Sequence, residues 1–377
     1  MDEEQKLIVG SVRKMAQEKI APLADTIDRE GSFRWDVAHY LAEMGLLQLY
    51  LPPEYGGLEK DNCLMFCICT EEVAKACASS ALSIVIQAVG SYPIIEFGTK
   101  DQKARFYPRL STGRELIAYL VSEPGAGSDV AAIKTKGVKK GKNYMLSGSK
   151  AFATNGGVAS LATVLCRTGK AGYSFFVIEM DSNGVILGKD EEKLGFRGSN
   201  TQGVTLDGVA VPCRNLIGKE GDGFKIAMQD FDMSRPGVAA LALGIAESAL
   251  HVAIKYASQR HAFGKPIVNH QAIEFMIADA STDIEAGRGL MLTAAELRDK
   301  GEKNTKWASM AKYFCSDAAM SITTNAIQII GGYGYCKDFP AERMFRDAKL
   351  TQIFEGTNQI QRIVVGREVL KDMGISF

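Results

Sequence analysis

The chain has 377 residues, of which 46% are hydrophobic and 23% are charged, values that are ordinary for a globular protein. Lys and Arg together number 44, as do Asp and Glu, so the formal net charge is zero. Because nucleic-acid binding needs a surplus of positive charge, this balance argues against nucleic acid as the main partner. The length favours two or three subdomains over one continuous core.

The cysteines indicate whether the chain binds a metal, and the first residues indicate its cellular compartment. Eight cysteines form no CxxC pair, and no histidines are spaced to complete a metal site, so we predict no bound metal and free, mostly buried thiols. The chain opens on the acidic segment MDEEQK, and its longest apolar run, Ala81 to Val89, is too short to cross a bilayer. We therefore expect a cytoplasmic protein without a membrane span.

The first 107 residues have the apolar spacing of helices. The segment LPPEYGG at 51–57 contains two prolines and two glycines and predicts a loop. Residues 62–77 and 78–97 are two largely apolar stretches, which we predict to be interior helices. Within the second stretch, we expect Gln87 and Ser91 to satisfy backbone groups rather than a ligand.

The middle of the chain predicts strands, because short β-branched or aromatic segments are bounded there by glycine or asparagine. These segments cover residues 117–121, 143–147, 163–166, 174–179 and 204–211. Lys136 to Lys142 and Asp181 to Gly184 have the composition of hairpin turns. We predict a small antiparallel barrel or sandwich of about 100 residues.

Two short motifs in the middle region could meet a ligand. In SEPGAGSD at 122–129, proline and glycine force an open loop whose backbone N–H groups and Ser128 hydroxyl could bind an anion or a polar ring edge. A plain turn is the alternative reading of this loop. FATNG at 152–156 places an aromatic face beside a hydroxyl, an arrangement that suits a flat heterocycle.

From Gly223 to the end, long helical periods return and predict a bundle of three or four antiparallel helices. The loop RHAFGKPI at 260–267 begins with an arginine that can hold a phosphate through two parallel bonds, although a surface ion pair is the alternative. Together with the glycine-marked helix end QIIGGYG at 328–334, it suggests a clamp for a diphosphate.

One glutamate near the C-terminus has the neighbours of a base. Glu355 lies between Ile353, Phe354 and Gly356, where poor water access would raise its pKa above the roughly 4.3 of free glutamate. A carboxylate with a raised pKa can take a carbon-bound proton. The alternative is that Glu355 opens a helix capped by Thr357.

Six motifs, taken in order and spacing, resemble the acyl-CoA dehydrogenase family over nearly the whole chain. They are SEPGAGSD at 122–129, FATNG at 152–156, KLGFRGSNT at 193–201, RHAFGKPI at 260–267, QIIGGYGY at 328–335 and IFEGT at 353–357. The resemblance implies an N-terminal all-α domain (1–115), a middle antiparallel β-barrel domain (116–225) and a C-terminal four-helix bundle (226–377). It also implies a homotetramer that binds FAD.

The resemblance assigns residues to the cofactor and to the substrate. FAD would be bound by Tyr119, Val121, Ser122, Gly127, Ser128, Phe152, Thr154, Arg260, Phe263, His270, Gln271, Gln328, Ile329, Gly331, Gly332, Thr357 and Gln359. Acyl-CoA would be bound by Ser128, Asp232, Arg235, Tyr92, Phe354 and Gly356. Arg260 would reach the diphosphate from a neighbouring subunit, and Phe152 stands where many members have tryptophan, a change that leaves ring stacking intact.

The resemblance also implies the chemistry. Glu355 would be the catalytic base that removes the α-proton while the β-hydride goes to flavin N5. Ser234 stands where isovaleryl-specific members carry their base, and a serine cannot serve. The thioester carbonyl would accept hydrogen bonds from the Glu355 backbone N–H and a ribityl hydroxyl, which acidifies the α-carbon.

The acyl group and the partner are less closely specified. Bulky Tyr92, Tyr333 and Phe354 favour a short, branched or alicyclic acyl group, and the lack of Arg or Lys between Ala76 and Phe97 disfavours a dicarboxylic one. The resemblance implies an electron-transferring flavoprotein as the acceptor. Two rival functions stay open: a flavoprotein oxidase or hydroxylase of the same fold, and a non-catalytic acyl-CoA-binding scaffold.

Overall fold

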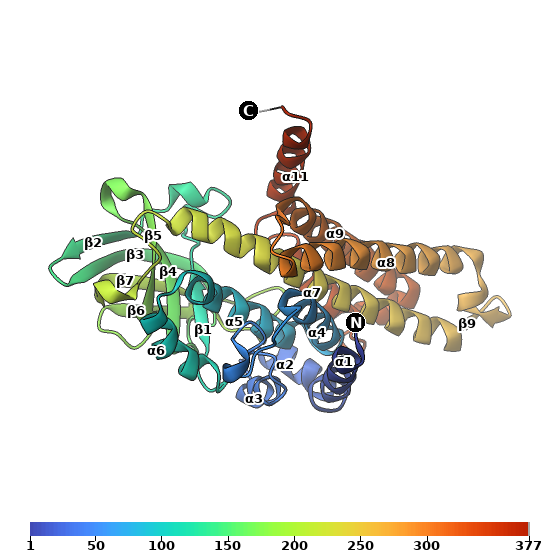
Figure 1. The fold of residues 1–377 in the computed structure, drawn as a ribbon. Helices are drawn as coiled ribbons and strands as arrows, with labels where there is room; N and C mark the ends of the chain where they lie inside the picture. The colour runs from blue at the N-terminus through green and yellow to red at the C-terminus, as the bar shows by residue number, and fades with distance from the viewer. Residues whose placement is uncertain (376–377) are drawn as a thin grey trace.

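The computed structural model describes residues 1–375 as helices, then a sheet, then helices again (Figure 1). The N-terminal helices are α1 (Glu3–Met15), α2 (Ala24–Glu30), α3 (Trp35–Glu43), α4 (Asn62–Ala76), α5 (Ala78–Phe97) and α6 (Lys100–Leu110). The single residue Cys77, with an extended backbone (φ −158°, ψ 115°), separates α4 from α5. Both helices are largely buried, which confirms the two predicted interior helices.

The polar residues of α5 serve the backbone, as predicted. Gln87 accepts a hydrogen bond from the Ile117 N–H through Oε1 (3.2 Å). Ser91 Oγ donates to the Gln87 carbonyl (2.6 Å). Gln87 therefore joins the buried helix to the start of the first strand.

Two helices, α5 and α7 (Gly223–Gln259), are long and apolar enough to cross a membrane by length and composition. The length of these helices therefore does not support the expectation that every apolar segment is too short to cross a membrane. In α5, however, 94% of the apolar window is buried inside the protein, and in α7 72% is buried. Core helices of a folded domain pass the same test, so these two helices are weak evidence for a membrane.

The middle region is one mixed sheet. Its strands are β1 (Ile117–Leu120), β2 (Lys136–Lys140), β3 (Asn143–Thr154), β4 (Leu161–Arg167), β5 (Tyr173–Glu179), β6 (Val185–Asp190), β7 (Thr201–Pro212) and β8 (Leu216–Ile217). The strand order is β6-β7-β3-β2-β4-β5-β8, and β1 also pairs with β4. Most pairs are antiparallel, but β1 and β2 run parallel to β4, so the expectation of a purely antiparallel sheet was wrong in this detail.

Two predicted turns differ from the structure. Lys136–Lys140 is a strand, and the hairpin to β3 turns only at residues 141 and 142, because Lys140 pairs with Asn143. The three lysines of this strand are exposed, and this charged composition is typical of a turn, so the strand was not predicted. Residues 181–184 do turn, but they are no hairpin: β5 pairs with β4 and β8, whereas β6 pairs with β7.

The C-terminal region is built from α7, α8 (Gln271–Asp299), α9 (Thr305–Ile330), α10 (Ala341–Thr351) and α11 (Asn358–Asp372). Two glycines let α7 lie close to α4. A Cβ at Gly237 would come within 2.3 Å of the Phe66 ring, and one at Gly244 within 2.5 Å of the Ala74 Cβ. The short hairpin β9 (His261–Ala262) and β10 (Lys265–Pro266) closes the far tip of this region (Figure 1).

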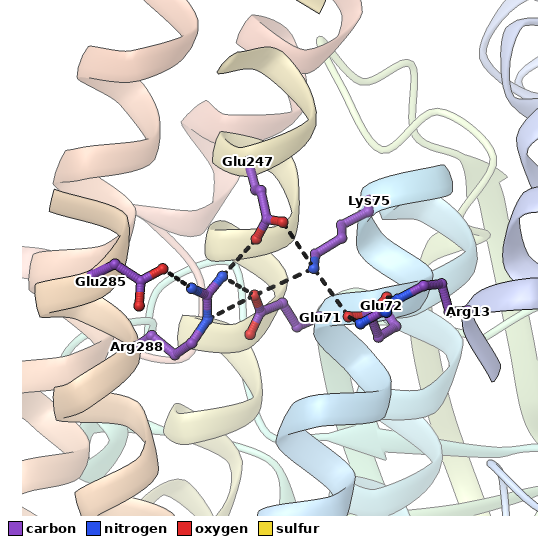
Figure 2. A network of polar contacts seen from close by, with 7 residues as sticks. All are labelled: Arg13, Glu71, Glu72, Lys75, Glu247, Glu285 and Arg288. Atoms are coloured by element: carbon purple, nitrogen blue, oxygen red, sulfur yellow. Dashed lines mark hydrogen bonds and ion pairs between the residues drawn. The ribbon is translucent and has the colours of Figure 1, made fainter. Parts of the chain in front are cut away.

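An ion-pair network, drawn in Figure 2, joins α1, α4, α7 and α8. Arg288 on α8 contacts Glu71 on α4 (2.6 Å) and Glu247 on α7 (2.5 Å). Lys75 contacts both Glu72 (3.0 Å) and Glu247 (3.1 Å). Because Glu71 is only 4% exposed, its charge depends on these partners.

Candidate functional site

Glu355 lies in the loop between α10 and α11, ahead of the helix. The N-cap of α11 is Thr357, whose side chain accepts from the Ile360 N–H (3.4 Å). Glu355 and Gly356 both have left-handed backbone conformations, with φ of 52° and 86°. The alternative in which Glu355 opens a helix is therefore wrong, and a non-glycine residue held at positive φ is typical of functional sites.

The Glu355 carboxylate faces α7. Its Oε2 accepts a hydrogen bond from Ser234 Oγ (2.8 Å). The carboxylate lies deep among protein atoms, whereas the residue as a whole keeps partial exposure. Ile353 does not shield it as expected, because that side chain is 51% exposed.

Burial raises the pKa of Glu355 above its usual value, although the Ser234 hydrogen bond and the charges of Arg235 and Lys312 act in the opposite direction. The amide of Glu355 has no hydrogen-bond partner within residues 1–375. The loop thus offers a carboxylate and a free N–H side by side, which is what deprotonation next to a carbonyl requires.

Pro236 breaks the hydrogen bonding of α7 where Ser234 and Arg235 enter the site. It has no N–H for the Asp232 carbonyl, which instead accepts from Asn304 Nδ2 (3.0 Å). Arg235 is 6% exposed and bonds to Asp232 Oδ1 (3.1 Å). The two predicted CoA ligands are therefore paired with each other, and the Arg235 Nε is left without a partner among the described residues.

The structure adds Asp230, which the sequence analysis missed. Asp230 is 0% exposed, and neither carboxyl oxygen has a hydrogen-bond partner within residues 1–375. Burial raises its pKa well above the usual range, the charge of Glu355 raises it further, and the adjacent Tyr119 phenol lowers it. Glu355 thus ionises first, and Asp230 keeps its proton to higher pH.

We predict that Asp230→Asn stabilises the protein at neutral pH. The carboxyl of Asp230 ionises at about 3.9 in the unfolded chain but at much higher pH when folded, so wild-type stability falls as pH rises between these values. Asparagine cannot ionise, and the gain should be on the order of 1–3 kcal/mol at pH 7. Guanidinium unfolding at pH 5 and pH 8 measures it; equal pH dependence in both proteins would contradict the prediction.

Tyr119 and Tyr92 are predicted ligands whose side chains point into the protein. The Tyr119 ring stacks on Phe175 (5.6 Å between centroids), and its hydroxyl oxygen is buried. Tyr92 is 3% exposed and accepts a hydrogen bond from Arg298 of α8 (2.5 Å). Helix α5 has no Arg or Lys of its own, but Arg298 of α8 places a cation beside it. This contact weakens the argument against a dicarboxylic acyl group.

The loop after β1 is held in place by Glu123 and is exposed at Gly127 and Ser128. Glu123 fixes it by accepting from the Thr135 N–H (2.9 Å) and from Lys150 Nζ (3.0 Å). A Cβ at Gly127 would meet no atom within 4 Å, and Ser128 is exposed. Nearby in sequence, Phe152 has φ of 55° at a bulge in β3 and is 69% exposed.

An opening of about 460 Å³ brings the predicted diphosphate residues together. It is lined by Arg260, Ile329, Gly331 and Gly332, with Tyr256, Ile267, Ile330, Tyr333 and Cys336. Arg260 is exposed and is free to bind an anion. Ile329, at 5% exposed, contributes only a wall of this opening.

The remaining predicted residues are spread along the C-terminal region. Phe263 is 97% exposed at the tip of the β9–β10 hairpin, and His270 packs edge-on against it (6.0 Å). Gln271, Gln328 and Gln359 are exposed, Ser122 is half-buried, and Val121 is buried. Phe354 packs against Phe196 (6.1 Å), and Thr154 and Thr357 are half-buried.

The base and the anion-binding opening are far apart within one chain. Ser234, which contacts Glu355, and Arg260 are 26 positions apart on a path that is helical up to Gln259. At 1.5 Å per residue, the separation is about 39 Å. One chain therefore presents two partial sites rather than one complete dinucleotide site.

Models of one protein family match this chain in three consecutive parts: the acyl-CoA dehydrogenase N-terminal domain at residues 2–114, the middle domain at 118–209 and the C-terminal domain at 221–370. The fold and the buried carboxylate accordingly define an oxidoreductase of acyl-CoA thioesters. The chain belongs to the acyl-CoA dehydrogenase family, which implies a flavin cofactor.

Similar proteins extend over the whole chain. Cyclohexane-1-carbonyl-CoA dehydrogenase of Geobacter metallireducens is 53% identical over 98% of both chains. Butyryl-CoA dehydrogenase of Megasphaera elsdenii superposes with a TM-score of 0.95 at 38% identity, covering 98% of this chain and 99% of that one. A chain from a structure of the electron transferring flavoprotein of Acidaminococcus fermentans superposes with a TM-score of 0.96 at 41% identity, covering 99% of both.

Proposed function

We propose that this chain is an FAD-dependent dehydrogenase that converts an alicyclic acyl-CoA, cyclohexane-1-carbonyl-CoA or a close analogue, to the 2-enoyl-CoA with Glu355 as the base. The observation that carries the proposal is the Glu355 carboxylate, which has a raised pKa and lies beside a free backbone amide. The 53% identity to the Geobacter metallireducens enzyme supports the alicyclic substrate.

The residues present suit FAD. The open backbone around Gly127, the exposed Phe152 ring and the opening beside Arg260 are suited to a dinucleotide, a flat ring system and a diphosphate, respectively. When bound, the flavin accepts the hydride from the β-carbon. Gln328, Gly331 and Gly332 would hold the adenine side.

The chain's own groups would carry the proton transfer. Glu355 takes the α-proton on its carboxylate, and the Glu355 N–H donates to the thioester oxygen, where negative charge develops. Ser234 holds the carboxylate toward α7 through its 2.8 Å hydrogen bond. The bound acyl group would exclude water from around the Glu355 carboxylate, which would keep it a strong base.

The acyl site would lie between α5 and the Glu355 loop, where Tyr92 and Phe354 leave room for a short or ring-shaped group. Both aromatic rings are held in place, Tyr92 by Arg298 and Phe354 by Phe196. A long acyl chain needs a deep unfilled channel, which these bulky side chains oppose.

We propose a homotetramer in which each FAD takes residues from two chains, a sharing that itself requires at least a dimer. The separation of about 39 Å along α7 is more than one FAD spans, so Arg260 and Phe263 would serve the flavin beside the Glu355 of a neighbouring copy. A side chain as apolar and exposed as Phe263 also suits an interface.

We further propose an electron-transferring flavoprotein as electron acceptor and the cytoplasm as compartment. The likeness to a chain from a structure of the electron transferring flavoprotein of Acidaminococcus fermentans supports the acceptor. Eight free cysteines are compatible with the cytoplasm. The proposed domain boundaries at 115 and 225 fall close to β1 and to the start of α7, which begins at Gly223.

Anaerobic mixing of purified protein with acyl-CoA thioesters tests the proposal. We expect the visible absorbance of the oxidised flavin to bleach with cyclohexane-1-carbonyl-CoA, and the product to have lost two hydrogens by mass spectrometry. Butyryl-, hexanoyl- and glutaryl-CoA serve as comparisons. Preference for glutaryl-CoA would overturn the substrate class.

The two rival functions give different results in the same apparatus. Rapid reaction of the reduced protein with oxygen would indicate an oxidase or hydroxylase. Flavin that binds but never bleaches with any of these thioesters would indicate the scaffold.

A further inference from the structure

A lysine from α9 is buried directly behind the loop that carries Glu355. Lys312 is 0% exposed and lies on the same face of α9 as Ala308, Cys315 and Ala319, which are also fully buried. Lysines are almost never fully buried without a partner. Its ammonium group therefore needs contacts that compensate for the loss of water.

Those contacts are with the base loop. Lys312 Nζ donates to the Gly356 carbonyl (2.8 Å) and to Asn358 Oδ1 (2.9 Å), on the C-terminal side of Glu355. Gln361 Nε2 donates to the carbonyls of Glu355 (3.1 Å) and Gly356 (3.0 Å). The left-handed conformation is unfavourable for Glu355, so the loop depends on such bonds to keep its shape.

Lys312 has no carboxylate within 4.0 Å in the described part of the chain, so its bonds are all to neutral oxygens. Burial lowers its pKa to about 7, whereas the charge of Glu355 raises it. Arg235 on α7 lowers it further, and Asp317 on α9 raises it. Asp317 is itself paired with Arg362 of α11 (2.5 Å), so Glu355 is the main uncompensated negative charge that faces Lys312.

We propose that Lys312 is a positioning residue for the base: its ammonium group holds the Gly356 carbonyl and Asn358 so that Glu355 keeps its left-handed conformation and faces the substrate, and its charge stabilises the Glu355 carboxylate. This inference rests on Glu355 being the base. Lys312 itself touches neither the substrate nor the reacting atoms.

The charge of Lys312 affects the pH dependence with a definite sign. A protonated Lys312 favours ionised Glu355, so it holds the pKa of Glu355 below the value that burial alone would give. Without this charge, Glu355 should keep its proton to higher pH, and the acidic limb of kcat against pH should move upward. In the wild type, loss of the Lys312 proton near pH 7 adds a second inflection.

Two variants separate the hydrogen bonds from the charge. Lys312→Met removes both at similar volume, and Lys312→Gln removes the charge but keeps a donor. Thr323→Val is the matched control, because Thr323 is also 0% exposed on α9 and bonds only within its own helix. All are purified with flavin bound, and kcat, KM and the thermal midpoint are measured from pH 5.5 to 9 with cyclohexane-1-carbonyl-CoA, a range chosen around the lysine's titration.

We expect both Lys312 variants to shift the acidic limb upward by about half to one pH unit and to lose the second inflection. Lys312→Met should also lose about 10- to 100-fold in kcat, with KM changed less than about threefold, because geometry and not binding is disturbed. Lys312→Gln should lose less in kcat, and Thr323→Val should leave the profile unchanged.

An acidic limb of kcat against pH that does not shift in either variant would overturn the inference. It would also be overturned if Lys312→Met impaired kcat, KM and the thermal midpoint together while Lys312→Gln kept the wild-type pH profile. Lys312→Gln carries the test alone if Lys312→Met does not fold. Wild-type protein that no acyl-CoA reduces would instead refute the proposed function, so the two failures are distinguishable.

Discussion

Glu355→Gln is expected to give a folded, yellow protein that binds acyl-CoA and has lost about 10²- to 10⁴-fold in kcat. The amide has the shape of the carboxylate and can still accept the Ser234 hydrogen bond, but it cannot take a proton. Because the pKa of Glu355 is raised, wild-type kcat should increase with pH as this group ionises, and the variant should lack that dependence. Stopped-flow measurement of flavin bleaching provides the rate.

Two controls make the result specific to Glu355. Ser234→Ala keeps the carboxylate and removes a bond that lowers its pKa, so activity should persist with the acidic limb at higher pH. A near-normal rate in Glu355→Gln would refute the role. If the Glu355→Gln variant kept its activity and the double variant Glu355→Gln with Asp230→Asn lost it, the carboxyl of Asp230 would be the base instead.

Arg288→Met is expected to lower the free energy of unfolding by about 3–5 kcal/mol, because it leaves Glu71 buried without its closest partner. Arg288 also contacts Glu247, so the change removes the ion pairs that link α8 to α4 and to α7 (Figure 2). Burial already raises the pKa of Glu71 despite Arg288, and removal of the cation should raise it further. Guanidinium unfolding at pH 7 measures the loss.

The double variant Arg288→Met with Glu71→Met is the control that separates the effect of an unpaired buried charge from the effect of altered packing. Removing both charges leaves no buried carboxylate without a partner, so much of the lost stability should return. A single variant as stable as the wild type would mean that water already compensates Glu71 and that the network contributes little.

The secondary structure could be predicted where local pattern and burial agree. The apolar runs of α4 and α5 are interior helices because all their faces meet protein. Strand β2 was missed because its side chains are mostly exposed lysines, so no apolar alternation marks it. The pairing of β1 with β4 depends on contacts between distant segments, which no local pattern encodes.

The site could be predicted only in part, for a related reason. Glu355 was found from its neighbours, although one of them, Ile353, proved exposed. Lys312 was missed although a signal was present: it falls on the buried face of α9, where every other residue is small or apolar. A charged residue at such a position is a candidate for a functional contact.

Asp230 and Arg298 illustrate what sequence spacing cannot reveal. Asp230 becomes an acid next to Glu355 only because α7 and the α10–α11 loop pack together over 125 positions of chain. Arg298 reaches Tyr92 from 206 positions away. Such pairs depend on tertiary packing and are therefore outside any local rule.

Glu355 has a left-handed backbone conformation that a glutamate does not favour, although the proposed chemistry needs its carboxylate there. Glycine adopts this conformation without penalty, whereas a residue with a side chain is unfavourable there. Selection for heat resistance alone would accordingly favour glycine at position 355. A glutamate at this position lowers the stability of the fold, which is the expected property of a residue that serves turnover and not folding.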